Sequence, residues 1–328
     1  MDTLDVTVVG AGMAGLACAR TLAAAGLSVR VYEREQSVGG RIASRADENG
    51  AFDFGAQYFT ARDPAFIREV DDWHEAGVVQ PWGGRIRTLR SGRVAALHGE
   101  TPRYIAVPAM QMLPRALAAD LDVALGSPVV ALEPTFLGWE LRAPGARTLA
   151  RSRRVVLALP PSDAGPLAAA TPALEEALAG HPMVPTWCVL ARFRASLDLA
   201  FDGAFVEHSP LAWIARNNSK PQRGHAECWV LHASHEWSAR HRSHPAQFVI
   251  DTLMRAFEDA TRCTTQPLAA RAHWWPNSAP QDALERGYLA DEAAGVVACG
   301  DWCLGGRVEN AFLSGRAAAL AVMKLRGL

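Results

Sequence analysis

The sequence predicts an α/β fold in two domains, one built on a parallel sheet and the other interleaved with it and built on an antiparallel mixed sheet. Three observations lead to this fold class. An apolar strand runs into a glycine-rich turn and an Ala-rich helix near the start of the chain. A strand, a second set of glycines and a helix recur near residue 300. Between these ends, alternating apolar segments rich in Trp and His predict antiparallel strands.

The first of these segments, VTVVGAGMAGLACARTLAAAGLSVRVYERE, is the most specific local pattern. It predicts a strand, a G-x-G-x-x-G turn, a helix over 13–25 and a second strand. Gly10 allows the tight turn, Gly12 lets a pyrophosphate touch the backbone, and Gly15 lets the helix pack on the strand. The helix begins at Met13 and Ala14, and its first N–H groups attract phosphates. The pattern predicts a Rossmann-like dinucleotide site.

The second strand ends at Glu33, about 20 residues beyond the glycines, where an acid can accept hydrogen bonds from the adenosine ribose. We assign Glu33 and the following Arg34 to the nucleotide site. A carboxylate at this place would repel a 2′-phosphate, which disfavours NADP here. The alternative, a glycine-rich turn without a ligand, is disfavoured because strand, helix, second strand and acid are all in register.

A second glycine pair helps to distinguish an FAD site from an NAD site. In SVGGRIASR, residues 37–45, Gly40 and Arg41 follow Glu33 closely, where an NAD enzyme would continue into another strand–helix unit. Another close backbone approach and an arginine suggest a phosphate or flavin contact. The run resembles the extended fingerprint of the flavin amine oxidase superfamily, in which this motif helps enclose FAD. The resemblance implies a Rossmann-like FAD-binding domain.

The segment VVACGDWCLGGRVENAFLSGRAAAL predicts a final parallel strand over 296–299 and a helix over 308–324. Ligands bind at the carboxyl ends of such strands, and the positive helix start can point at the flavin. The alternative is a strand–turn–helix that only completes the fold. To the cofactor site we assign Gly300, Asp301, Gly306, Arg307 and Val308.

Two segments in the first half of the chain complete the expected cofactor contacts. In FDFGAQYF, small residues precede Gln57 and Tyr58, which suits a strand passing the flavin edge, although an ordinary half-buried strand is the alternative. Val129 opens an expected strand over 129–133 and is assigned to the same site. The division of the chain follows: an FAD-binding domain formed by 1–61, 104–165 and 290–328, and a substrate domain formed by 62–103 and 166–289.

Composition excludes several function classes. The formal net charge is −1, which gives no field for nucleic acid or a membrane surface. We find no signal peptide and no apolar run of about 18 residues, so we expect a cytoplasmic protein without membrane contact. Six scattered cysteines without a Cys-x-x-Cys pair fit a reducing compartment. The ten histidines show no metal-ligand spacing, and G-x-S-x-G is absent, so neither a metal site nor a serine hydrolase is expected.

Five segments taken together indicate a subgroup within this superfamily. GGRIASR, FDFGAQYFTARD, LAWIARNNSKP, LHASHEWS and GDWCLGGRVENAFLSG together resemble the bacterial renalase-like flavoproteins over most of the chain. The resemblance implies non-covalent FAD and oxidation of off-pathway dihydronicotinamides, 2-dihydro-NAD(P) or 6-dihydro-NAD(P), with O2 as acceptor and NAD(P)⁺ and H2O2 as products. Asn310 departs from the pattern because a small residue is expected there, so the pocket beside the flavin can differ in shape.

Hydride donation by a dihydropyridine requires orientation rather than a strong base. We expect the substrate face to contain Tyr58, His232, His273 and Trp274, with a core or interface role as the alternative for each. Arg216 or Lys220 could meet phosphates. Alternative functions are an amine or other small-molecule oxidase and a non-catalytic FAD-binding protein, whereas the repeated glycine motifs disfavour an NAD-dependent dehydrogenase. A monomer or weak homodimer is expected.

Overall fold

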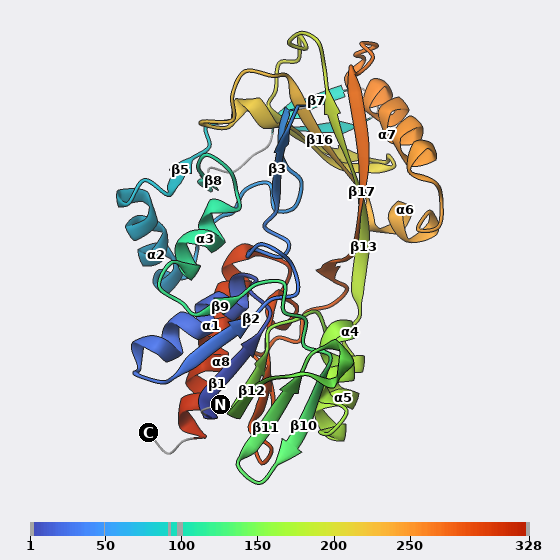
Figure 1. Ribbon diagram of the computed structural model, residues 1–328. Coiled ribbons are helices and arrows are strands. Elements are labelled where there is room, and N and C mark those ends of the chain that lie inside the picture. Colours follow the sequence, from blue (N-terminus) through green and yellow to red (C-terminus); the bar gives the residue numbers. More distant parts are fainter. Residues whose placement is uncertain (1–2, 49, 91–92, 97–100, 326–328) are drawn as a thin grey trace.

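The computed structural model describes residues 3–48, 50–90, 93–96 and 101–325. Two sheets lie at opposite ends of an elongated molecule (Figure 1). We call the sheet that contains the N-terminal strand the nucleotide sheet and the other the substrate sheet. The nucleotide sheet comprises β1 (Thr3–Val9), β2 (Val29–Tyr32), β9 (Val123–Ala124), β10 (Ala131–Thr135), β11 (Gly138–Arg142), β12 (Thr148–Leu157), β18 (Leu289–Asp291) and β19 (Val296–Ala298).

The centre of the nucleotide sheet is parallel: β1 pairs with β2 and β12, and β12 pairs with β19. Alternate residues of these strands point to opposite faces. Val8 lies in the core under α1 (Met13–Ala24) and α8 (Val308–Lys324), whereas Val9 lies in the core under α4 (Pro161–Ala164) and α5 (Pro172–Ala179). Helices therefore cover both faces, as parallel strands require.

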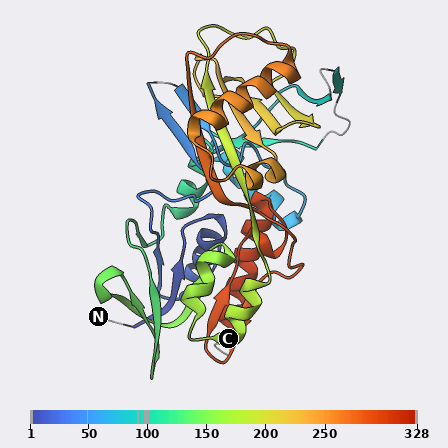
Figure 2. The ribbon, with the colours of Figure 1, turned by 90° about the vertical axis from the view of Figure 1, so that its right-hand side faces the viewer.

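The substrate sheet has the order β17-β13-β16-β15-β14-β6-β7, and all its pairs are antiparallel except β6 with β14. Its predicted mixed, mainly antiparallel character is thus confirmed. α7 (Ala246–Thr261) crosses its outer face and α6 (His235–Arg240) packs on β13 (Figure 2). The strands are β6 (Ile86–Arg90), β7 (Arg93–Ala96), β13 (Met183–Arg192), β14 (Gly203–Glu207), β15 (Leu211–Arg216), β16 (Cys228–Ala233) and β17 (Ala269–Pro280).

Several shorter elements connect the two sheets. The hairpin of β3 (Ser44–Asp47) and β4 (Gly50–Asp53) extends from the nucleotide side to β16. Although we expected 62–103 in the substrate domain, α2 (Pro64–Glu75) packs on α8, with the rings of Phe66 and Phe312 5.3 Å apart. Among the described residues of that segment, β6 and β7 join the substrate sheet. The remaining elements are β5 (Val79–Pro81), β8 (Tyr104–Ala106), α3 (Met112–Ala118) and the short 3₁₀ turns η1 (Pro144–Ala146), η2 (Gly165–Ala168), η3 (Asn217–Ser219) and η4 (Asp301–Cys303).

None of the helices in the described ranges has the length and apolar character needed to cross a membrane.

Candidate cofactor and substrate site

The three glycine-rich segments meet in space. Gly12 and Gly39 form a parallel bridge, and the Gly39 N–H donates to the Ala11 carbonyl at 2.9 Å. Arg41 forms a two-pronged ion pair with Asp301, with Nη2–Oδ1 at 2.7 Å and Nη1–Oδ2 at 2.8 Å, across 260 residues of sequence. The second glycine motif therefore links the beginning of the chain to its end.

The turn before α1 has room for a phosphate. A Cβ built on Gly12 would meet no other atom within 4 Å, whereas a Cβ on Gly15 would overlap the Gly10 carbonyl oxygen. No side chain caps α1, and the first N–H groups, at Met13 and Ala14, have no carbonyl partner within the helix. The open space at Gly12 and the free helix start together suit an anionic pyrophosphate.

The carboxylate of Glu33 is buried at the end of β2 and held in place. Its Oε2 accepts from the Ala11 N–H at 2.8 Å, and its Oε1 accepts from the Glu35 N–H at 3.0 Å. Val129 lies in the loop whose Ser127 N–H donates to the Glu33 carbonyl, and the strand expected over 129–133 is found as β10, which begins at Ala131. Arg34 is exposed and pairs with Asp163 at 3.3 Å and with Glu35 at 3.6 Å.

Asn310 stabilises the glycine turn before α8. Its Nδ2 donates to the carbonyls of Leu304 at 2.6 Å and Gly305 at 2.9 Å, and Gly305 has a φ of +103° that favours glycine. Gly300 is buried after β19, and Gly306 packs on Pro280. Arg307 precedes α8 and Val308 begins it, without a capping side chain. The residue that departs from the family pattern thus fixes the local backbone.

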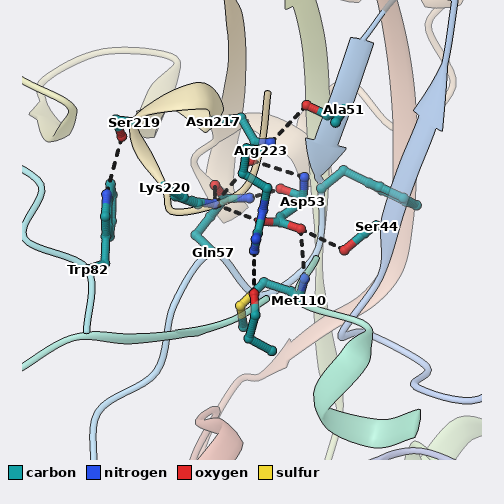
Figure 3. Close-up of polar contacts among 12 residues, drawn as sticks. Ser44, Ala51, Asp53, Gln57, Trp82, Met110, Asn217, Ser219, Lys220 and Arg223 are labelled. Atoms are coloured by element: carbon teal, nitrogen blue, oxygen red, sulfur yellow. Dashed lines mark hydrogen bonds and ion pairs between the residues drawn. The ribbon is translucent and has the colours of Figure 1, made fainter. Parts of the chain in front are cut away.

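A buried charge network connects β4 to the loop after β15 (Figure 3). Asp53 Oδ2 accepts from Lys220 Nζ at 3.1 Å and Arg223 Nε at 3.0 Å, while Oδ1 accepts from Ser44 Oγ at 2.6 Å and the Met110 N–H at 3.0 Å. Burial alone would raise the pKa of Asp53, but the two cations and these hydrogen bonds hold it below its ordinary value. Asp53 is therefore an ionised carboxylate whose hydrogen-bonding capacity is fully used.

Lys220 also orients Gln57. The ammonium donates to Gln57 Oε1 at 3.1 Å and to Asn217 Oδ1 at 3.2 Å, and Gln57 Nε2 donates to the Asp53 carbonyl. Burial lowers the pKa of Lys220 to about 8. The sequence alone predicts no role for Asp53 or Arg223. In the sequence, Asp53 stands between two phenylalanines, and Arg223 follows Lys220 in the NNSKPQR loop. Neither pattern indicates a buried ion pair.

Two predicted substrate-face histidines lie on one face of the substrate sheet. His273, Cys188, His232 and Trp213 stand opposite one another across β17, β13, β16 and β15. Direct partners in antiparallel strands share a face. We call this row the inner row, because it faces the β3–β4 hairpin. Tyr58 contacts Trp213 with ring centroids 5.5 Å apart.

Both histidines of the inner row are held neutral. Burial lowers the pKa of His232 to about 4 and also lowers the pKa of His273. His232 Nε2 lies 3.0 Å from the Phe54 carbonyl, so the neutral ring carries its proton on Nε2 and donates it there. Trp275 Nε1 donates to the same carbonyl at 3.0 Å. The Phe54 ring packs on His273 with centroids 4.8 Å apart.

Trp274 points to the opposite face from His273. Its ring packs on Trp187 at 4.9 Å in the core beneath α7. The structure therefore brings together Tyr58, His232 and His273 through Trp213 and Phe54, but it does not bring Trp274 to them. Among the residues that the structure describes, no cluster of His, Cys, Asp and Glu has the arrangement of a metal site.

Comparison with known proteins agrees with this arrangement. A family model described as NAD(P)-binding Rossmann-like domain matches residues 8–73, and one described as flavin containing amine oxidoreductase matches residues 82–323. Putrescine oxidase of Kocuria rosea is 43% identical over 68 residues, which span 21% of this chain and 14% of that enzyme.

Two solved structures have a similar fold over 100% of both chains. A candidate protoporphyrinogen oxidase from Exiguobacterium sp. 255-15 superposes with a TM-score of 0.80 at 12% identity. Cyclohexylamine oxidase from Brevibacterium oxydans IH-35A superposes with a TM-score of 0.75 at 15% identity. Because the second family model covers most of the chain and the converging glycine segments fit a dinucleotide, the protein belongs to the flavin-containing amine oxidoreductase family and is an FAD-dependent oxidoreductase.

Proposed function

We propose that the protein is a renalase-like oxidase that oxidises off-pathway dihydronicotinamide dinucleotides, 2-dihydro-NAD(P) or 6-dihydro-NAD(P), to NAD(P)⁺. The observation that carries the proposal is the chemistry of the inner row. It offers aromatic surfaces and neutral imidazoles, while Asp53, the carboxylate beside Gln57, is committed to Lys220 and Arg223. A site whose imidazoles are only weak bases suits a donor from which no proton has to be removed.

A dihydropyridine becomes aromatic when it gives up a hydride, so no proton has to be removed from the reacting carbon. When bound, FAD supplies the acceptor that takes the hydride and passes two electrons to O2, giving H2O2. The chain's contribution is to position the donor. The rings of Tyr58 and Phe54 provide flat apolar surfaces, and His232 Nδ1, which bonds to no described residue, accepts a hydrogen bond from the carboxamide.

A second candidate function is amine oxidation, which the family membership favours. Two of the similar proteins are named putrescine oxidase and cyclohexylamine oxidase. The rings of Trp82 and Trp213 lie 5.9 and 5.5 Å from that of Tyr58, and the three rings could surround the alkyl group of an uncharged amine. A primary amine must lose its ammonium proton before oxidation, and the neutral histidines could accept it only weakly.

Anaerobic mixing of the FAD-loaded protein with single donors distinguishes these functions. We expect 2-dihydro-NAD or 6-dihydro-NAD to bleach the flavin absorbance within seconds, and readmitted air to restore it with one H2O2 per donor. NADH, putrescine and cyclohexylamine should act at least a hundredfold more slowly. Fast bleaching by NADH alone or by an amine would contradict the proposal, and bleaching by no donor would favour a non-catalytic FAD-binding protein.

A further inference from the structure

Arg103 is a cation without a counter-ion among the residues that the structure describes. It lies just before β8 with its guanidinium over the Tyr58 ring, 5.4 Å from the centroid. Its Nε is buried and has no hydrogen-bond partner, and no described acid lies within ion-pair distance. Other arginines near the site are paired: Arg41 with Asp301 and Arg223 with Asp53. A half-buried guanidinium that no described carboxylate neutralises requires an explanation.

Trp213 provides a second unpaired donor next to the same ring. It is 8% exposed, its Nε1 makes no hydrogen bond, and its ring centroid is 5.5 Å from that of Tyr58. Several buried tryptophans elsewhere in the chain do find acceptors: for example, Trp229 donates to Glu227 at 2.8 Å and Trp302 to the Leu159 carbonyl at 3.1 Å. Native proteins leave few such groups unpaired, and a bound ligand is one way to pair them.

The surrounding charges favour an anion. Lys220 lies 5.6 Å from the centre of the Trp82 ring, which in turn is 5.9 Å from that of Tyr58. Lys220 and Arg223 share one carboxylate, Asp53, so this buried group carries an excess of positive charge whenever Lys220 is protonated. Arg103 adds another positive charge. A cationic substrate would be repelled from this side of the site, and an anionic one attracted.

We propose that Arg103 and Trp213 form an anion-binding subsite around Tyr58, which holds a phosphate of the dinucleotide donor. The inference deepens the proposed function and rests on it for the identity of the donor. The guanidinium fork matches two phosphate oxygens, and Trp213 Nε1 donates to a further oxygen of the same donor. The subsite selects phosphorylated donors over their ribosides and over free amines.

The binding test uses redox-inert anions, so it does not depend on turnover. The FAD-loaded protein is titrated with ADP-ribose and with pyrophosphate while flavin absorbance and tryptophan fluorescence are followed. Arg103→Met should weaken binding at least tenfold, and Arg103→Lys, which keeps the charge but loses the fork, by a smaller factor. Arg68→Met, which removes an exposed arginine of α2, is the matched control and should bind like the wild type.

A second variant separates ligand binding from a structural role. Trp213→Phe keeps an aromatic ring and removes the unpaired donor together with part of the indole, so it should weaken ADP-ribose binding several-fold at a modest loss of melting temperature. A fall in melting temperature with unchanged ADP-ribose binding would show that Trp213 only stabilises the fold. Wild-type protein that binds neither ADP-ribose nor pyrophosphate, or binding that Arg103→Met leaves intact, would overturn the subsite.

Comparing flavin reduction by phosphorylated and uncharged donors tests the anion-binding subsite independently of the proposed function. Arg103→Met should slow flavin reduction by 2-dihydro-NAD or 6-dihydro-NAD at subsaturating donor, yet leave reduction by the matching uncharged dihydronicotinamide riboside unchanged. Equal losses with both donors would contradict the subsite. If no dihydronicotinamide reduces the flavin but anion binding still requires Arg103, the proposed function fails and the subsite stands.

Discussion

Burial determines the protonation states that the side chains of the site adopt. His232 is the clearest example, because its pKa falls to about 4 from an ordinary value of 6.5. Between these values the unfolded chain binds a proton that the folded chain does not. Stability therefore rises as the pH increases from about 4 to 6.5 and is lost as the pH falls through the same window. Asp53, with its lowered pKa, adds a further loss below pH 3.8.

Replacing His232 tests this linkage. Since the ring is partly exposed, we expect His232→Gln to remove about 1–3 kcal/mol of the difference in unfolding free energy between pH 4.5 and pH 7. Urea unfolding at both pH values, with saturating FAD, measures the difference for each protein. A variant whose stability still falls as steeply as that of the wild type would assign the acid sensitivity to other groups. His225→Gln, which replaces an exposed histidine, is the control.

At the scale of the elements, the turn into α1 contains two glycines with different roles: Gly12 leaves space for a ligand, and Gly15 allows close packing. A Cβ on Gly12 would extend into open space, and its φ of −77° suits any residue. A Cβ on Gly15 would overlap the Gly10 carbonyl. We therefore expect Gly12→Ala to fold with a stability within about 0.5 kcal/mol of wild type but to lose FAD affinity, and Gly15→Ala to lose about 1–3 kcal/mol by overpacking.

Unfolding of the FAD-free proteins and the flavin content after purification measure the two effects separately. If Gly12→Ala retained FAD at wild-type affinity, the pyrophosphate would not lie against this backbone. If Gly15→Ala were as stable as the wild type, the strand and helix could separate without loss.

Elements with a strong local pattern were predictable from the sequence, and contacts between distant elements were not. The helix at 308–324 agrees with α8, and the helix over 13–25 is confirmed within one residue. The direction of the Trp274 side chain could not be predicted. Period-2 alternation in a strand rich in Trp and His separates two faces but does not identify which face contacts the ligand. The Asp53–Lys220 pair joins residues 167 positions apart, and α2 packs on α8 through rings that carry no pairing signal.

At the scale of the whole molecule, the nucleotide and substrate sheets are joined by long strands and by polar contacts. The β3–β4 hairpin reaches the substrate sheet, and Asn217 holds its end: the Asp53 N–H donates to Asn217 Oδ1 at 3.1 Å, and Asn217 Nδ2 donates to the Ala51 carbonyl at 2.8 Å. Asp53 supplies the charge that makes the neighbouring Lys220 and Arg223 tolerable in the core. The network therefore sets the position of Gln57 relative to the substrate sheet.

In this network two cations, Lys220 and Arg223, share one carboxylate, Asp53, so losing the acid should destabilise the fold more than losing one cation. Asp53→Asn leaves two buried cations without a counter-ion and should lower the unfolding free energy by about 3–5 kcal/mol. Lys220→Met removes a desolvated cation and keeps the Asp53–Arg223 pair, so it should lower it by less, about 1–2 kcal/mol. Denaturant unfolding with saturating FAD measures both. The double variant should be more stable than the sum of the two losses implies, because the methionine removes one of the stranded charges. Additive losses, or a larger loss for Lys220→Met, would mean that packing rather than charge pairing holds the hairpin on the substrate sheet.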